Sequence, residues 1–200
     1  MTFTLTKPPT QEERSIIISG VTWEQMESLE AIFDQVGGGV RFFYLDGSLE
    51  IMTLGTEHGF VKSTIRLLLE AYLREKNIRF YARGGPTFGS KEDNARKEPD
   101  QSYNLATKKS TPDLVIEVVF TSGGLDKLEF YRRFGVTEVW FWEDGVLSIY
   151  YLENEQYQKV TTSQLLPELD LTLFCRYITY FDQYDAVTEF VQALRMGSGL

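Results

Sequence analysis

The strongest constraint on the fold is a carboxylate inside an apolar run. Residues 112–120 read PDLVIEVVF, and Glu117 stands there between an isoleucine and a valine. The β-branched residues predict a buried strand. An ionised side chain is costly to bury unless it is paired. The run therefore predicts a central strand whose carboxylate binds either a functional cation or a structural partner such as Arg83 or Arg132.

A second extended segment, DQSYNLA at residues 100–106, precedes this run and is joined to it by a turn-rich linker. An antiparallel hairpin that turns between Lys108 and Lys109 pairs Asp100 with Glu117. Directly opposite residues have Cβ atoms about 5 Å apart. Two like charges at that separation repel, so we expect either a cation between them or a proton on one. Mg²⁺ or Mn²⁺ suits carboxylate oxygens and would satisfy both side chains.

Two further residues belong to this hypothesis. Asp113 shares a face with Glu117, because residues two and four apart in a strand point to one side. It also follows a proline, as many turn residues do, so we expect it to be a further ligand or a turn residue. Lys127 lies in the first turn of the next predicted helix. Its long side chain would reach the strand end and orient a water or stabilise charge on a phosphate.

The remaining pattern predicts a single domain over residues 1–200, with residues 1–15 as a mobile arm. The fold class is α+β of the α/β/α type, with a mixed central sheet flanked by helices, an extra N-terminal hairpin and a C-terminal helix. The expected elements are a helix from a Thr22–Gln25 capping box, a hairpin over 41–53 that turns at Asp46–Gly47, a helix from Glu57, a strand over 78–83, a polar stretch over 84–99, a three-stranded meander over 137–160 and a helix over 179–195.

Composition favours a cytoplasmic protein. There is one cysteine, Cys175, and no apolar run is long enough to cross a bilayer. The net charge of −9 argues against nucleic acid as a partner. However, residues 62–133 hold fourteen of the twenty basic and only ten of the twenty-nine acidic residues, a local net charge of +4 against −13 elsewhere. This distribution indicates either a basic rim around an acidic centre or ordinary solvated faces.

The blocks EPDQSY, PDLVIEV and DKLEFYRRFGVTEVWFW, together with GSLEIMT and EHG, resemble the Uma-two family of restriction endonucleases, a branch of the PD-(D/E)xK nuclease superfamily. The resemblance covers roughly residues 20–185. It implies a restriction-endonuclease-like core of helix, three-stranded antiparallel sheet, helix and final strand. It also implies metal-dependent cleavage of DNA.

The resemblance assigns roles to the same acids. Asp100 matches the aspartate of the superfamily's first motif, and Glu117 matches its second acid. The superfamily lysine stands two residues after that acid, a position occupied here by Val119. In Uma-two proteins a helical KLxxY block supplies the lysine instead, and this block matches Lys127 and Tyr131. The displaced lysine is a departure from the wider superfamily pattern.

Two more residues lie in blocks that the family shares. Glu50 is expected to be a supplementary acid of the metal site. His58, the only histidine, is expected either to bind the metal or shuttle a proton, or else to cap its helix and face solvent.

The leading hypothesis is therefore a Mg²⁺- or Mn²⁺-dependent DNA endonuclease that acts as a homodimer. One alternative is a catalytically silent module that kept the fold for nucleic-acid binding or assembly. Another is a hydrolase of smaller phosphoesters. The aromatic residues over 140–151 are expected to be core packing, or else an exposed set for base stacking or a dimer contact.

Overall fold

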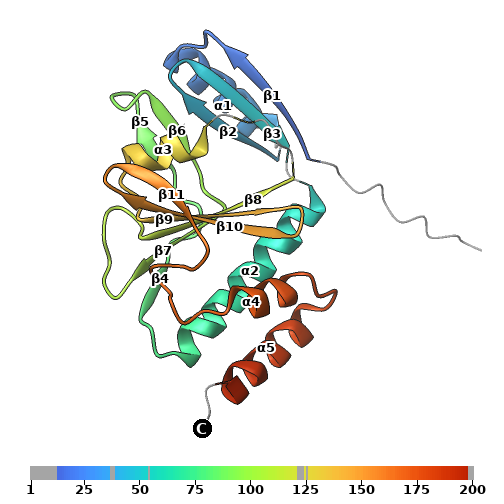
Figure 1. The fold of residues 1–200 in the computed structure, drawn as a ribbon. Helices are drawn as coiled ribbons and strands as arrows, with labels where there is room; N and C mark the ends of the chain where they lie inside the picture. Colours follow the sequence, from blue (N-terminus) through green and yellow to red (C-terminus); the bar gives the residue numbers. More distant parts are fainter. Residues whose placement is uncertain (1–12, 37–38, 54, 121–123, 125, 198–200) are drawn as a thin grey trace, which may run out of the picture.

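The computed structural model describes residues 13–36, 39–53, 55–120, 124 and 126–197. Within these residues the chain forms helices and two β-sheets (Figure 1). The helices are α1 (Trp23–Val36), α2 (Thr56–Glu75), α3 (Lys127–Arg133), α4 (Leu171–Ile178) and α5 (Gln183–Gly197). The strands are β1 (Arg14–Ser19), β2 (Val40–Leu45), β3 (Ser48–Thr53), β4 (Phe80–Ala82), β5 (Phe88–Ser90), β6 (Ala95–Lys97), β7 (Gln101–Leu105), β8 (Leu114–Val119), β9 (Glu138–Glu143), β10 (Val146–Glu153) and β11 (Gln156–Val160).

The larger sheet has the order β11-β10-β9-β8-β7-β4, and only its β8–β9 pair is parallel. The smaller sheet has the order β1-β3-β2-β6-β5 and is antiparallel throughout. The predicted α+β class with a mixed sheet and flanking helices is confirmed. The hairpin over 41–53, expected as an addition, is instead the centre of a second sheet, because β1 and β6 pair with its two outer edges.

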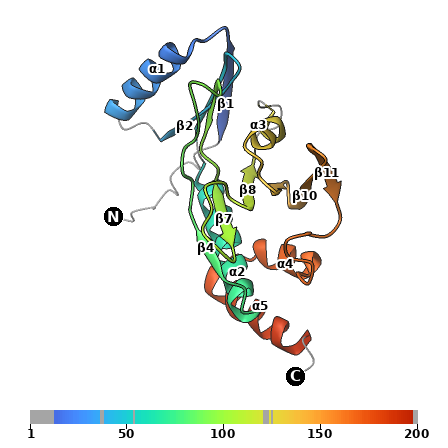
Figure 2. The same cartoon turned by 90° about the vertical axis from the view of Figure 1, so that its left-hand side faces the viewer.

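Apolar clusters hold the elements together in four layers. One face of the larger sheet packs against α2, α4 and α5 through a cluster that includes Trp140, Leu68 and Phe174. The other face packs against α3 and the smaller sheet through Phe43 and Phe130, among others. Helix α1 covers the far face of the smaller sheet (Figure 2). The central strands β7 and β8 therefore have protein on both sides.

The hairpin β7–β8 has the register that the sequence predicts. Gln101 pairs with Ile116 and Tyr103 with Leu114, so Asp100 stands level with Glu117 at the next position along the ladder. Gln101, Tyr103 and Ile116 face α2, and the odd-even alternation of a strand sends Asp100 and Glu117 to the opposite face. The two acids thus point into the layer between the two sheets.

Several local predictions are also borne out. Thr22 and Gln25 exchange the two reciprocal hydrogen bonds of a capping box, at 2.8 and 3.2 Å. Asp46 and Gly47 both have positive φ, as a two-residue hairpin turn requires. The aromatic residues of β9 are core residues, with Trp140 fully buried.

Other expectations were wrong. Arg14 and Ser15, assigned to a mobile arm, begin β1, and residues 1–12 of that arm lie outside the described residues. The C-terminal region forms two helices instead of one, because Asp170 caps α4 with a 3.0 Å hydrogen bond from Leu173 N. Among the described helices, none combines the length and apolar character that a membrane span requires.

Candidate functional site

The site is built around Asp100 and Glu117, which are 3% and 2% exposed. Strand pairing between β7 and β8 holds the two side chains next to each other on one face. The backbone N–H of Val118 donates to Oδ2 of Asp100 at 2.9 Å, which fixes the aspartate against β8. Two buried carboxylates at facing positions require strong compensation from their neighbours.

Glu117 receives that compensation from Lys97 and Tyr131. Lys97, on β6 of the smaller sheet, places Nζ 3.0 Å from Oε2 of Glu117. The hydroxyl of Tyr131, on α3, donates to Oε1. The ion pair therefore exists, but the partner is Lys97 and not Arg83 or Arg132. Those two arginines contact the carbonyl oxygens of residues 109 and 110 and the carboxylate of residue 129, respectively.

Asp100 lies against three basic side chains. Its Oδ1 is 2.8 Å from His58 Nε2, 3.3 Å from Arg41 Nη1 and 3.8 Å from Lys62 Nζ. Burial by itself disfavours the ionised carboxyl. The hydrogen bond and charge of His58, with the charges of Lys97 and Arg41, outweigh burial and hold the pKa of Asp100 below its ordinary value. Asp100 is therefore ionised at neutral pH.

His58 links this acid to a second one. Its Nδ1 lies 2.7 Å from Oε2 of Glu13, so each ring nitrogen has a carboxylate acceptor. Burial opposes the imidazolium, but the hydrogen bonds and charges of Asp100 and Glu13 dominate and raise the pKa of His58 to about 9. Both ring nitrogens are thus engaged by carboxylates in this structure. The expectation of a capping or solvent-facing His58 is wrong, because the side chain is buried and the N-cap of α2 is Gly55.

The raised pKa of His58 predicts a pH-dependent stability. A histidine whose pKa rises from 6.5 to about 9 stabilises the fold fully below pH 6.5, and this contribution disappears as pH rises through 9. Urea unfolding in EDTA measures the free energy of unfolding of wild type and of His58→Gln. The advantage of wild type in this free energy should be about 3 kcal/mol larger at pH 6 than at pH 10. A difference between the two proteins that stays constant across this range would contradict the imidazolium assignment.

Lys127 is the first residue of α3, and its side chain is half-buried. Asp126 caps the helix by accepting a 2.9 Å hydrogen bond from Glu129 N. Burial lowers the pKa of Lys97 first, and the positive charge of Lys127 lowers it further, although Glu117 opposes both. Lys127 is thus close enough for its charge to act on the Lys97–Glu117 pair.

Glu50 lies on β3 and is 2% exposed. It pairs across the ladder with Phe43, which in turn pairs with Lys97, so Glu50 and Lys97 point from the same face of the smaller sheet. A Cβ atom at Gly124 would lie 2.7 Å from Oε1 of Glu50. The carboxylate therefore packs closely against the connection between β8 and α3, beside the site.

Asp113 is not brought to the pair. Its Oδ2 accepts a 2.8 Å hydrogen bond from Leu105 N, and its Oδ1 lies 2.6 Å from Lys109 Nζ. It stands four residues before Glu117, which is about 13 Å along a strand. These contacts correspond to the turn alternative, since they close the β7–β8 hairpin. At that distance Asp113 and Glu117 do not share one cation.

The donor set of the pair fits a hard divalent cation. Asp100 and Glu117 offer carboxylate oxygens on neighbouring strands, the ligand type that Mg²⁺ and Mn²⁺ prefer. Among the described residues, no group of three or more His, Cys, Asp or Glu is arranged to hold a metal ion. Mg²⁺ commonly uses one or two carboxylates and completes its shell with water and phosphate oxygens, so two carboxylates suffice.

Lys97, Arg41 and Glu13 are members of the site that the sequence patterns did not predict. Lys97 comes three residues before Asp100, and a lysine in a short strand beside a motif aspartate is the signal that was available. Arg41 and Glu13 lie fifty-nine and eighty-seven positions from Asp100, and nothing in their local sequence marks them. Their contacts depend on the docking of the smaller sheet onto the larger one.

The chain is similar to known proteins in sequence and in structure. The sequence matches the Uma2 family, described as putative restriction endonuclease, over residues 23–178. The structure is similar to the crystal structure of a putative nuclease belonging to DUF820 from Anabaena variabilis, with 13% identity, a TM-score of 0.44, and coverage of 74% of this chain and 90% of that chain. No protein with a curated description matches the sequence. Because the match takes in most of the chain, this protein belongs to the Uma2 family of putative restriction endonucleases.

Proposed function

We propose that the protein is a Mg²⁺- or Mn²⁺-dependent endonuclease that hydrolyses DNA phosphodiester bonds. The observation that carries the proposal is the facing pair of buried carboxylates, Asp100 and Glu117, with basic side chains around it. Such a pair suits a divalent cation, and the basic groups suit a phosphate. Membership of the Uma2 family supports DNA as the substrate. The single cysteine supports the expected cytoplasmic location.

The residues of the site would have the following roles. Asp100 and Glu117 would hold the cation, which would supply an activated water and neutralise charge on the scissile phosphate. Lys127 orients the attacking water or stabilises the charge that develops on the phosphate. His58 keeps Asp100 ionised and in place. Glu50 supplements the acids from the neighbouring sheet.

Arg41 and Lys62 would form the phosphate-binding rim. Their side chains are 21% and 23% exposed, so both are partly accessible from solvent while they contact Asp100. They belong to different layers of the molecule, β2 and the first half of α2. A DNA strand lying between these elements would meet positive charge on two sides of the acidic pair.

Supercoiled plasmid tests the proposal directly. Wild-type protein should convert it to nicked and linear forms with Mg²⁺ or Mn²⁺, and EDTA should stop the conversion. A parallel screen of model phosphodiesters separates a nuclease from a hydrolase of smaller phosphoesters. Conversion that continues in EDTA, or turnover of the small substrates alone, would overturn the proposal.

The two lysines predict different variant behaviour. Lys127→Met should reduce cleavage about 100-fold with an unchanged unfolding midpoint, since it removes one charge that acts on the reacting phosphate. Lys97→Met should reduce both cleavage and stability, because it leaves the buried carboxylate of Glu117 without the Lys97 ammonium. Lys159→Met, an exposed residue of β11, is the control. Equal loss of stability in the Lys97 and Lys127 variants would contradict this division.

A silent module for nucleic-acid binding or assembly is the second candidate. It is favoured by Lys97 and His58, which already neutralise the two acids without a metal. Titration calorimetry with Mn²⁺ separates the two. A nuclease should bind Mn²⁺ in a manner that Asp100→Asn removes, whereas a silent module should show no such binding.

A further inference from the structure

Strand β1 forms the outer edge of the smaller sheet (Figure 1). Its inner side pairs with β3 from Arg14 to Ser19, and within the described part of the chain no strand pairs with its outer side. The three isoleucines in its centre are exposed by 58%, 44% and 40% at Ile16, Ile17 and Ile18. An apolar edge with unpaired backbone groups is a template for another strand.

Within its own sequence and pairing, β1 lacks the features that usually protect an edge strand. Its sequence, RSIIIS, contains neither proline nor lysine, and its one charge, Arg14, stands at the end. The register with β3 is one-to-one over six positions, so no bulge twists the edge away. A groove of about 600 Å³ between β1 and α1 extends the apolar surface through Ile18, Leu29 and Ile32. Ile32 is 56% exposed.

The sequence of β1 is complementary to itself. Residues 15–19 read SIIIS in both directions. An antiparallel pair centred on Ile17 places Ile17 opposite its own copy, Ile16 opposite Ile18, and Ser15 opposite Ser19. A closed two-fold interface requires that a surface match itself in this way. The occupant that this edge fits best is therefore a second copy of the same chain.

We propose that two copies pair through β1 and join their smaller sheets into one continuous ten-stranded sheet. Antiparallel pairing of identical edges places the two-fold axis perpendicular to the sheet, so equivalent faces of both copies lie on the same side. Glu50 and Lys97 point from one such face. The two candidate sites therefore lie on the same side of the joined sheet. Resting on the proposed nuclease function, this arrangement presents two sites to one DNA duplex.

The strand also connects the interface to the site. Glu13 immediately precedes β1 and contacts His58, which holds Asp100. In the dimer β1 lies inside the continuous sheet, with β3 on one side and the partner's β1 on the other. The contact of Glu13 with His58 therefore lies next to the interface.

Sedimentation velocity tests the interface. Wild type should sediment as a dimer, and Ile17→Lys should weaken association about 100-fold, because it sets two ammonium groups opposite each other across the axis. Val146→Lys is the matched control, since Val146 is an equally β-branched strand residue with 61% exposure on β10. It should remain a dimer. A monomeric wild type would overturn the proposal, and is the result expected if the chain's own N-terminal segment covers β1. An Ile17→Lys protein that still dimerises would also overturn it.

Disulfide trapping provides a second measurement that does not depend on weakening the fold. In a protein with Cys175→Ser, Ile17→Cys should form a covalent dimer on mild oxidation, whereas Val146→Cys should not. If neither cysteine variant or both variants form the covalent dimer, the proposed register is wrong. Plasmid cleavage separates this inference from the function: a trapped dimer without cleavage refutes only the nuclease, and a cleaving monomer refutes only the dimer.

Discussion

Glu117→Gln is expected to reduce metal-dependent plasmid cleavage by on the order of 1,000-fold. The substitution keeps the size of the side chain but removes the negative charge that binds the cation. It also leaves Lys97 without a charged partner at 3.0 Å. The measurement is the initial rate of nicking at saturating Mn²⁺, with circular dichroism to establish that the variant is folded.

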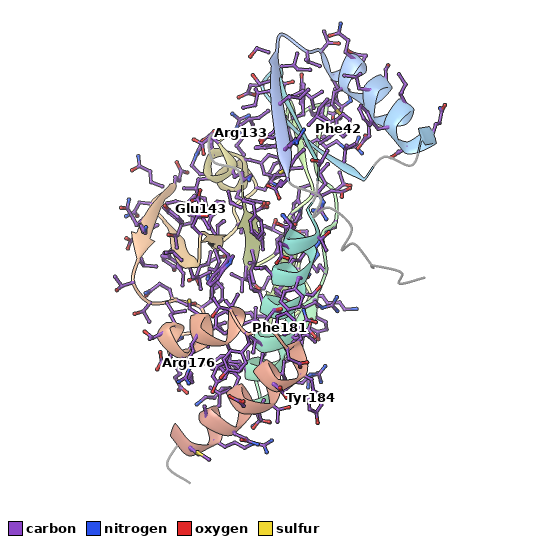
Figure 3. All side chains as sticks on the ribbon, turned by 90° about the vertical axis from the view of Figure 1, so that its right-hand side faces the viewer. Phe42, Arg133, Glu143, Arg176, Phe181 and Tyr184 are labelled. Atoms are coloured by element: carbon purple, nitrogen blue, oxygen red, sulfur yellow. The ribbon has the colours of Figure 1, made fainter. Side chains whose placement is uncertain are left out.

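Glu143→Gln is the control for this substitution. Glu143 lies at the end of the adjacent strand β9, level with Val119, and its side chain is exposed (Figure 3). Its loss should leave cleavage within about twofold of wild type, because the charge of an exposed side chain is screened by solvent and salt. If Glu117→Gln nicks plasmid as fast as this control, the acid has no part in the reaction.

Glu138→Ala is expected to lower the free energy of unfolding by about 4 kcal/mol. Glu138 is fully buried at the start of β9 and accepts four hydrogen bonds. The donors are Trp140 Nε1 at 2.6 Å, Ser163 Oγ at 2.5 Å, Gln164 N at 2.8 Å and Leu165 N at 3.3 Å. Truncation removes this acceptor from the buried donors Trp140 Nε1 and Ser163 Oγ and opens a cavity in the core.

Urea unfolding measures this loss, and Glu143→Ala on the same strand is its matched control. The exposed residue should change stability by less than about 0.5 kcal/mol. Through its hydrogen bonds with Gln164 N and Leu165 N, Glu138 holds the segment after β11 against the larger sheet. Its loss should therefore also accelerate hydrogen exchange of these two amides. A Glu138→Ala protein within about 1 kcal/mol of wild type would show that water replaces the carboxylate.

Local patterns predicted much of the fold correctly. The capping box at Thr22, the turn at Asp46–Gly47 and the apolar face of α2 each depend on residues within one or two turns of chain. The β7–β8 register is the one that a turn centred between Lys108 and Lys109 gives. Even the buried charge of Glu117 was visible, because an acid in an apolar strand stands out.

The identity of the partners required the tertiary structure. Short-range reasoning offered Arg83 or Arg132 for Glu117, but the ion pair is with Lys97, which the sequence placed in a polar stretch. His58 was expected to be either a ligand or a surface residue. It is a buried imidazolium between acids forty-five residues before it and forty-two residues after it.

The sequence by itself determined many of the helices and strands, although not β1 or α4, and that two acids of the central hairpin share a face, because hydrogen-bonding geometry and side-chain alternation act over a few residues. Only the tertiary structure decided that a second sheet docks over this hairpin and brings Lys97 and Glu50 to it. Whether β1, β2 and β6 form that sheet depends on the apolar surface buried between layers. Burial is non-directional and joins segments far apart in the chain, so no local pattern encodes it.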